Sequence, residues 1–164
     1  MFAATDVQYL PTGTARAALV LASDAAFSSI VAEETALVPE VAPYEPGKFY
    51  RRELPPLRAV LATALPNVEL LIVDGYVDLD PSGRPGLGAH AHKEFGVPVI
   101  GVAKTRFATA THAIPVIRGQ SARPLFVTSA GLPLPDAAAL VHAMSGRYRL
   151  PDALRRTDQL ARGR

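Results

Sequence analysis

Apolar residues in the first third of the chain recur in the pattern typical of β-strands. Residues 3–10 and 15–23 are rich in apolar and β-branched side chains, and a turn that contains proline and glycine separates them. Residues 27–38 continue in the same style after a second turn. The pattern therefore predicts three antiparallel strands. A loop over residues 39–47 follows, because its three prolines suit neither a helix nor a central strand.

The rest of the chain alternates between helical and strand patterns. Residues 51–64 have apolar positions at three- and four-residue spacing, which predicts an amphipathic helix that tolerates its two prolines in a first turn. The short apolar run 68–73 is typical of a strand covered on both faces. Further strands are expected over 97–102, 114–117 and 124–128, and further helices over 83–95, 135–144 and 151–160.

This order of elements predicts an α/β fold in which helices flank a mixed β-sheet in a single domain over residues 1–164, as in ribonuclease-H-like nucleases. It also fits several other mixed α/β domains. The composition agrees with one domain, since 49% of the 164 residues are hydrophobic and 20% are charged. The absence of cysteine excludes disulfides and thiolate metal sites. No apolar run approaches the roughly 20 residues of a membrane span, and a secretory signal is not evident, so we expect a cytoplasmic protein without membrane contacts.

The positive charge is concentrated near the C-terminus. Residues 147–164 contain six arginines and two aspartates, a net charge of +4, whereas the remainder holds 11 basic and 13 acidic residues, a net charge of −2. Such a segment predicts contact with a phosphate-bearing partner. The alternative is a solvated, arginine-rich terminal helix.

Four acidic residues come from elements that a fold can bring to one cleft: Asp6, Glu53, Asp74 and Asp158. Clustered carboxylates raise one another's pKa, and a divalent cation with a preference for oxygen ligands, Mg²⁺ or Mn²⁺, keeps them ionised. Such ions complete their shells with phosphate oxygens, which predicts phosphodiester hydrolysis. Asp6 is the most informative of the four, because an acid is unusual inside a sheet.

The other three acids each have an ordinary structural alternative. Asp74-Gly75 is also a common turn dipeptide, and Glu53 is also a favourable residue for the first turn of a helix. Asp158 has an exposed ion pair with Arg155 as its alternative.

The segments that carry these acids resemble endonuclease V, the deoxyinosine-directed nuclease. The resemblance extends from residue 6 to residue 158 and rests on the order and spacing of several separated blocks. These are Asp-Val-Gln-Tyr at 6–9, Tyr-Glu-Pro-Gly running into Arg-Glu at 44–53, Val-Asp-Gly at 73–75, Gly-Leu-Gly-Ala-His at 86–90, Gly-Val-Ala-Lys at 101–104, and Gly-Arg-Tyr-Arg-Leu-Pro at 146–151 with the last acid at 158.

The resemblance implies metal-dependent cleavage of DNA or RNA near a deaminated purine, leaving 3′-hydroxyl and 5′-phosphate ends. Asp6, Glu53 and Asp74 would hold the Mg²⁺ or Mn²⁺ ion. Asp158 would assist at the metal or orient the attacking water. Lys104 would contact a phosphate or the developing charge, although a lysine after a strand is commonly just exposed.

The resemblance also implies a substrate-binding set. Tyr44 lies in the block that the family uses as a wedge, where an aromatic ring fills the space left by an extruded base, although a proline-flanked tyrosine is also a common rim residue. Three glycines would let backbone approach that base, and His90 would be structural or face the substrate. The full set is Tyr44, Pro46, Gly47, Gly86, Gly88, His90 and Gly101.

Three features depart from the family pattern. Asp80 stands where a histidine is usual, and a carboxylate cannot replace a proton donor at neutral pH. Residues 130–132 read Ala-Gly-Leu in place of Pro-Gly-His. The first strand also lies almost at the chain start, so we expect the surface that a preceding helix would cover to face solvent or another subunit.

Two classes of function follow. The first is a metal-dependent endonuclease of the endonuclease V type. The second is a divergent relative that binds nucleic acid through its basic tail with little or no cleavage. Retention of the four acids favours the endonuclease, because a carboxylate cluster repels phosphate unless a metal is bound. Asp80 in place of the usual histidine favours the non-cleaving relative. A small-molecule α/β enzyme is less compatible, since a glycine-rich nucleotide fingerprint is missing.

Overall fold

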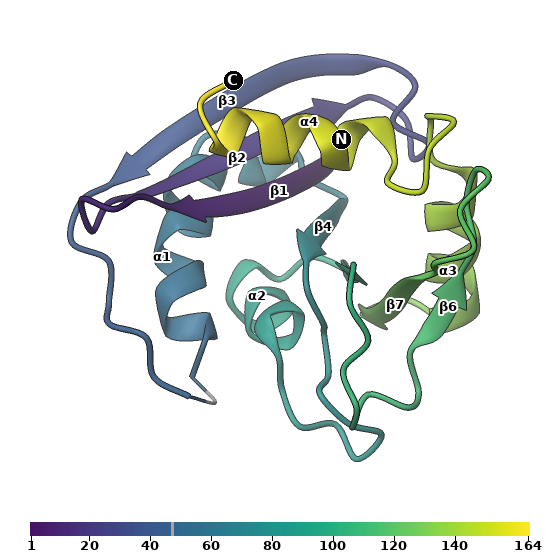
Figure 1. Ribbon diagram of the computed structural model, residues 1–164. Coiled ribbons are helices and arrows are strands. Elements are labelled where there is room, and N and C mark those ends of the chain that lie inside the picture. Colours follow the sequence, from purple (N-terminus) through teal and green to yellow (C-terminus); the bar gives the residue numbers. More distant parts are fainter. Residues whose placement is uncertain (47) are drawn as a thin grey trace.

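Seven strands form one mixed sheet in the order β3-β2-β1-β4-β5-β7-β6 in a computed structural model that describes residues 1–46 and 48–164 (Figure 1). β1, β4 and β5 are parallel to one another, and the other neighbours pair antiparallel. The strands are β1 (Phe2–Tyr9), β2 (Ala15–Ala22), β3 (Ile30–Val38), β4 (Leu70–Asp74), β5 (Val99–Ala103), β6 (Ile114–Val116) and β7 (Leu125–Ala130). The helices are α1 (Tyr50–Leu61), the short 3₁₀ helix η1 (Leu65–Asn67), α2 (Leu87–Phe95), α3 (Leu134–Ala143) and α4 (Asp152–Ala161).

The predicted α/β fold is therefore confirmed, with small differences at the ends of elements. β3 begins at Ile30 rather than at 27, because the Asp24 carboxylate accepts backbone N–H bonds from Ala26, Ser28 and Ser29 and closes a turn there. α2 begins at Leu87 rather than at 83.

The prolines of α1 were expected in its first turn, and that prediction is wrong. The helix begins at Tyr50, so Pro55 and Pro56 lie in the second turn, where the missing N–H groups leave the carbonyls of Arg51 and Arg52 without their helical donors.

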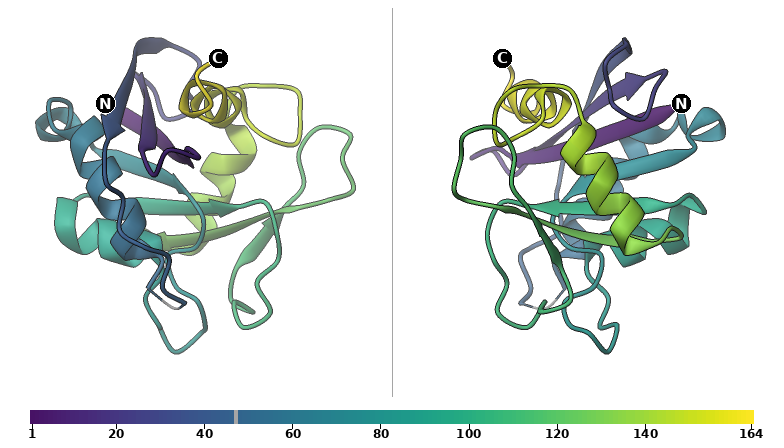
Figure 2. Two further views of the ribbon diagram at one scale, coloured as in Figure 1. Left: turned by 60° about the vertical axis from the view of Figure 1, so that its left-hand side comes forward. Right: turned by 90° about the vertical axis from the view of Figure 1, so that its right-hand side faces the viewer.

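Helices cover both faces of the sheet, as the views in Figure 2 show. α1 and α2 pack on one face, where Leu57, Leu61 and Ala91 meet Leu71 and Val73. α3 and α4 pack on the other. Alternate residues of β4 therefore enter different cores, which explains why its run is apolar without interruption. Among the described residues, none of the helices has the length and apolar character needed to span a membrane.

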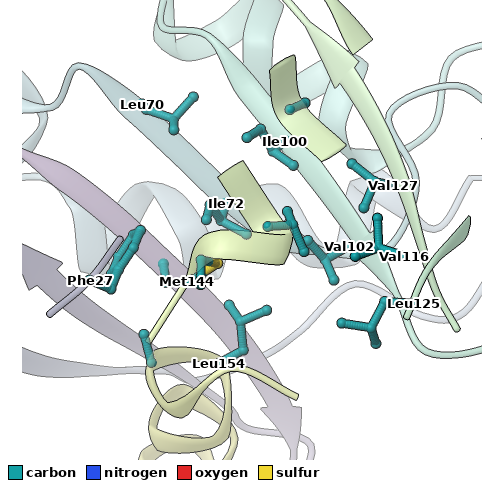
Figure 3. Close-up of a cluster of buried hydrophobic side chains, with 14 of the residues drawn as sticks. Phe27, Leu70, Ile72, Ile100, Val102, Val116, Leu125, Val127, Met144 and Leu154 are labelled. Atoms are coloured by element: carbon teal, nitrogen blue, oxygen red, sulfur yellow. The ribbon is translucent and has the colours of Figure 1, made fainter. Parts of the chain in front are cut away.

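The second core lies between β4, β5, β7 and the helices α3 and α4. Figure 3 shows Ile72, Ile100, Val102 and Val127 in one apolar cluster that also includes Leu154 of α4. These side chains are buried. This core holds α4 against the sheet, where the helix packs on β1 and β2.

Candidate active site

Asp6 and Asp74 lie side by side on neighbouring parallel strands. The register of β1 and β4 pairs Thr5 with Val73, so each aspartate follows a paired residue and points to the face covered by α4. Both aspartates line a cavity of about 10 Å³ together with Lys104 of the segment after β5 and Thr157 of α4. A space of this size holds about one water-sized particle.

Glu53 reaches the same two aspartates from the opposite face. It lies in the first turn of α1, is 7% exposed, and lines a second cavity of about 10 Å³ with Asp6 and Asp74. The three carboxylates named from the sequence thus come together from two strands and a helix. A turn at Asp74 and a helix start at Glu53 would explain where the two residues lie along the backbone. Neither alternative explains why their carboxylates come together with that of Asp6.

Burial and mutual repulsion change the proton affinity of this cluster. Burial, followed by the charge of Asp74, raises the pKa of Asp6 to about 6, although Lys104 and the Val7 N–H oppose the shift. Burial likewise raises the pKa of Glu53 to about 7, with further contributions from the charges of Asp6 and Asp74. Without a compensating cation, the cluster therefore retains protons at pH values where ordinary carboxyl groups are ionised.

Lys104 supplies positive charge to this cluster. Its Nζ lies 2.8 Å from Oδ2 of Asp74, and its side chain is 38% exposed. Burial lowers the pKa of Lys104, but the charges of Asp74, Asp6 and Asp158 raise it by more, so the ammonium stays protonated at neutral pH. Within residues 1–46 and 48–164, no three histidine or acidic side chains are arranged closely enough to hold a metal as they stand.

Asp158 lies at the edge of the site on α4. Its charge acts on both Asp6 and Lys104. The carboxylate accepts a hydrogen bond from Arg162 at 3.0 Å, whereas Arg155 pairs with Asp152. The alternative pairing of Asp158 with Arg155 is therefore wrong, and Asp158 remains close to the aspartate pair.

An apolar pocket of about 300 Å³ opens beside Asp74. The loop 76–85 and the segment 105–109 form part of its wall, because the Tyr76 hydroxyl donates to the Thr105 carbonyl at 2.7 Å and accepts the Phe107 N–H at 2.9 Å. His90 supports another part, since its ring stacks on Tyr50 with centroids 3.6 Å apart. The pocket is lined by Phe49, Tyr50, Asp74, Gly75, Tyr76, Leu79, Pro85, Gly86, Leu87 and Phe107.

The three glycines named from the sequence have different surroundings. Gly86 lines the pocket, but its N–H already donates to the Val77 carbonyl at 2.7 Å. A Cβ on Gly88 would lie 2.6 Å from Cγ2 of Val77, and a Cβ on Gly101 would lie 2.6 Å from the Gly75 carbonyl oxygen. These two glycines therefore let the segment 75–77 pack closely behind the pocket.

Replacing Gly101 with alanine is expected to destabilise the fold and lower activity. The new Cβ would also lie 2.7 Å from Oγ1 of Thr128, which accepts the Val77 N–H, so the wall behind Asp74 must shift. We expect a loss of about 1 to 3 kcal/mol in urea unfolding. Gly13→Ala, in an open turn with φ +81°, should cost about 1 kcal/mol and leave activity intact. Equal activity in the two variants would contradict this account.

Residues 39–46 run downward on the outer side of α1 in Figure 1. Tyr44 is 62% exposed and Pro46 is also exposed. Gly47 lies outside the described residues. The wedge role of this block stays a prediction.

Asp80 caps a turn rather than facing the carboxylates. Its Oδ1 accepts hydrogen bonds from the Ser82 hydroxyl at 2.7 Å and from the Arg84 N–H at 3.1 Å. The bond from the Ser82 hydroxyl, with the others, holds the pKa of Asp80 below its ordinary value. Asp80 is therefore a carboxylate at neutral pH, as expected, and donates no proton.

Most arginines of the C-terminal segment are used within the fold. Arg156 donates to both carboxylate oxygens of Glu33 at 2.8 Å and ties α4 to β3. Arg149 donates to the backbone carbonyls of Lys104, Arg123 and Pro124. We expected the arginines of residues 147–164 to be available for a phosphate-bearing partner. For Arg149 and Arg156 this prediction is wrong, because both guanidinium groups are bound within the fold.

Sequence reasoning missed several residues around the site. Thr157 gives no sequence signal but lines the aspartate cavity. Arg118 is 5% exposed, and it donates to the backbone carbonyls of His142, Met144, Gly146, Tyr148 and Arg149.

Comparisons with known proteins identify the family to which the chain belongs. The family model for endonuclease V matches residues 1–126. Endonuclease V of Azotobacter vinelandii is 37% identical over 171 residues, covering 91% of this chain and 76% of the relative. The crystal structure of endonuclease V from Streptomyces avermitilis has a TM-score of 0.82 at 34% identity, covering 99% of this chain and 79% of that one.

A further structure has the same fold at lower identity. Endonuclease V of Ciona intestinalis, in complex with a 24mer DNA containing an inosine followed by a ribo-adenosine, has a TM-score of 0.81 at 19% identity and covers 99% of this chain and 84% of that one. The match of the family model to most of the chain, and relatives above 30% identity over nearly its whole length, lead to one conclusion. This chain is a member of the endonuclease V family.

Proposed function

We propose that this protein is a divalent-metal-dependent endonuclease that hydrolyses a phosphodiester near inosine in DNA or RNA, as a step in the repair of deaminated nucleic acid. The observation that carries the proposal is the convergence of Asp6, Glu53 and Asp74 on small cavities beside the Lys104 ammonium. A module that only binds phosphate gains nothing from three clustered carboxylates, because they repel its ligand.

The donor set fits a hard divalent cation. Asp6, Glu53 and Asp74 offer oxygen ligands. Burial, together with the charges of the neighbouring carboxylates, raises the pKa values of Asp6 and Glu53, and a bound cation would favour their ionised forms. These three residues would hold Mg²⁺ or Mn²⁺. When bound, the ion would polarise the phosphate and lower the pKa of a bound water.

Lys104 and Asp158 complete the chemistry on the side of α4. The Lys104 ammonium is protonated and half-buried, so it is suited to stabilise the negative charge that develops on the phosphate oxygens. Asp158 carries a carboxylate within electrostatic reach of Asp6, and it is suited to orient the attacking water. Products with 3′-hydroxyl and 5′-phosphate ends follow when the water oxygen bonds to phosphorus and the bond from phosphorus to the 3′ oxygen breaks, so that the 3′ oxygen leaves and takes up a proton.

The apolar pocket beside Asp74 is the proposed site for an extruded base. Its volume of about 300 Å³ and its aromatic lining suit a planar heterocycle. The N–H groups of Gly86 and Gly88 are already paired with the Val77 and Tyr76 carbonyls, so the base edge would be read by other groups. The structurally similar Ciona protein was crystallised with inosine-containing DNA, which supports inosine as the base tested first.

Cleavage of a matched set of labelled strands tests this proposal. DNA and RNA oligonucleotides that differ only in adenosine, guanosine or inosine at one position would be incubated with enzyme and Mn²⁺. We expect incision near inosine alone and a 5′-phosphate on the downstream product. Phe107→Ala, which removes one aromatic wall of the base pocket, should reduce selectivity for inosine more than Arg58→Gln, which changes an exposed residue of α1. Equal incision of all strands would contradict base-directed cleavage.

A further inference from the structure

A second recess lies next to the aspartate cavity and is not part of the base pocket. It measures about 580 Å³ and is lined by Gln120, Ser121, Arg147, Tyr148, Arg149 and Leu150. Leu150 also lines the cavity that contains Asp6, Asp74 and Lys104. Arg149 donates to the Lys104 carbonyl from the same segment. The recess therefore adjoins the proposed reaction centre on the side of Lys104.

The recess is held in shape by backbone contacts between two loops. Gly119 has φ +61°, and a Cβ there would lie 2.5 Å from the Arg147 carbonyl oxygen, so the two loops touch at this point. Arg118 donates to the Tyr148 carbonyl at 2.8 Å. The left view of Figure 2 shows the loop around residue 120 beside the loop that precedes α4. These contacts fix the backbone at Tyr148.

The side chains of the recess offer flat surfaces and positive charge. Tyr148 is 47% exposed. The Cζ atoms of Arg147 and Arg155 lie 5.0 Å and 4.7 Å from the centroid of its ring. The Arg147 guanidinium also donates to the Tyr148 hydroxyl at 2.8 Å. None of the described residues that line the recess is acidic.

We propose that this recess holds a nucleotide of the strand that is cut. This nucleotide is next to the scissile phosphate and lies on the Lys104 side of the reaction centre. A base stacks on the Tyr148 ring or on a guanidinium plane, and Arg147 contacts the adjacent phosphate. The occupant is a single-stranded segment, because the faces of a base are free for stacking only outside a duplex. The proposal rests on the proposed function, since the bound strand is the substrate of the neighbouring site.

Photochemical cross-linking tests the position of the strand. Single-stranded oligonucleotides with one inosine would carry 5-iodouracil at successive positions on each side, and the wild-type protein would be irradiated with each in EDTA. We expect cross-links to Tyr148 from a narrow group of positions on one side of the inosine. The absence of a cross-link to Tyr148 from every position would overturn the proposal.

Binding measurements on variants give a second readout. By fluorescence anisotropy in EDTA, Tyr148→Leu should weaken binding of the inosine strand about tenfold, whereas Tyr148→Phe, which keeps the ring, should stay within about twofold of wild type. Arg147→Gln should reduce the slope of log K against log salt by about 0.7, as for one phosphate contact on a single strand. Arg58→Gln controls for the loss of one exposed positive charge. Unchanged binding by Tyr148→Leu would overturn the proposal.

Failure of this proposal is distinguishable from failure of the proposed function. If the wild type cuts inosine strands while Tyr148→Leu binds them as tightly as wild type does, the recess proposal alone is wrong. If the wild type cuts no strand but Tyr148 cross-links and Tyr148→Leu binds weakly, the strand site is supported and the endonuclease function is wrong.

Discussion

Asp6→Asn is expected to abolish strand cleavage and at the same time to stabilise the metal-free protein. Asparagine keeps the shape of the side chain but removes a charged oxygen ligand between Glu53 and Lys104. Loss of several kcal/mol of transition-state stabilisation corresponds to a decrease in rate of about a thousandfold or more. Single-turnover cleavage at enzyme excess measures this loss.

The gain in stability follows from the raised pKa of Asp6. The folded protein binds this proton with a pKa of about 6, against an ordinary value of 3.8, so the free energy of unfolding falls as the pH rises from about 4 to about 6 and stays lower above that range. Asparagine removes this penalty. We expect the variant to be more stable by about 1 to 3 kcal/mol at pH 8 in EDTA, and the gain to disappear near pH 4.

Thermal unfolding at the two pH values checks this expectation. Asp136→Asn is a matched control, because Asp136 is an exposed aspartate in the first turn of α3. The free energy of unfolding of this variant should fall by a few tenths of a kcal/mol, because Asp136 interacts favourably with the helix dipole. Asp136 is outside the carboxylate cluster, so the change should not reflect the cluster. A loss of stability in Asp6→Asn at pH 8 would show that the cluster is not under electrostatic strain.

Arg118→Met is expected to cause the largest loss of stability. The guanidinium is buried and bonded to backbone carbonyls of the segment 142–149, which leads into α4. Methionine fills much of the volume but leaves these carbonyls without donors. We expect a loss of about 3 to 5 kcal/mol in the free energy of unfolding by urea.

Two further variants define the cause of that loss. Arg118→Lys should recover little, because one ammonium group cannot replace a planar fork of donors. Arg58→Met removes an exposed ion pair with Glu94, 2.6 Å between nitrogen and oxygen, and should cost less than about 1 kcal/mol. A loss in Arg118→Met as small as in Arg58→Met would refute the role of Arg118 as the support of this segment.

Local patterns were sufficient to predict most of the strands and helices and the α/β class of the fold. The uninterrupted apolar run of β4 predicts a strand buried on both faces, and α1 and α4 do cover opposite faces. An acid inside β1 and another at the end of β4 predicted a shared cleft, and the parallel register places Asp6 beside Asp74. The strand predictions succeeded because burial on one or both faces of a strand leaves a pattern in a short stretch of sequence.

Contacts between distant segments were not predictable in the same way. Arg118 and Arg149 look like surface charges in the sequence, yet both bind backbone carbonyls, and a carbonyl has no sequence signature. The stacking of His90 on Tyr50 depends on how α1 and α2 pack. Charge counting gave the sign of the C-terminal segment but could not show that Glu33 of β3 pairs with Arg156.

The most direct test of the central claim is single-turnover cleavage of an inosine-containing oligonucleotide at enzyme excess. We expect incision by the wild type in Mn²⁺ or Mg²⁺, none in EDTA, and none by Asp6→Asn or Asp74→Asn in either metal. An intact strand after incubation of the folded wild type with Mn²⁺, or full incision by Asp74→Asn, would contradict it.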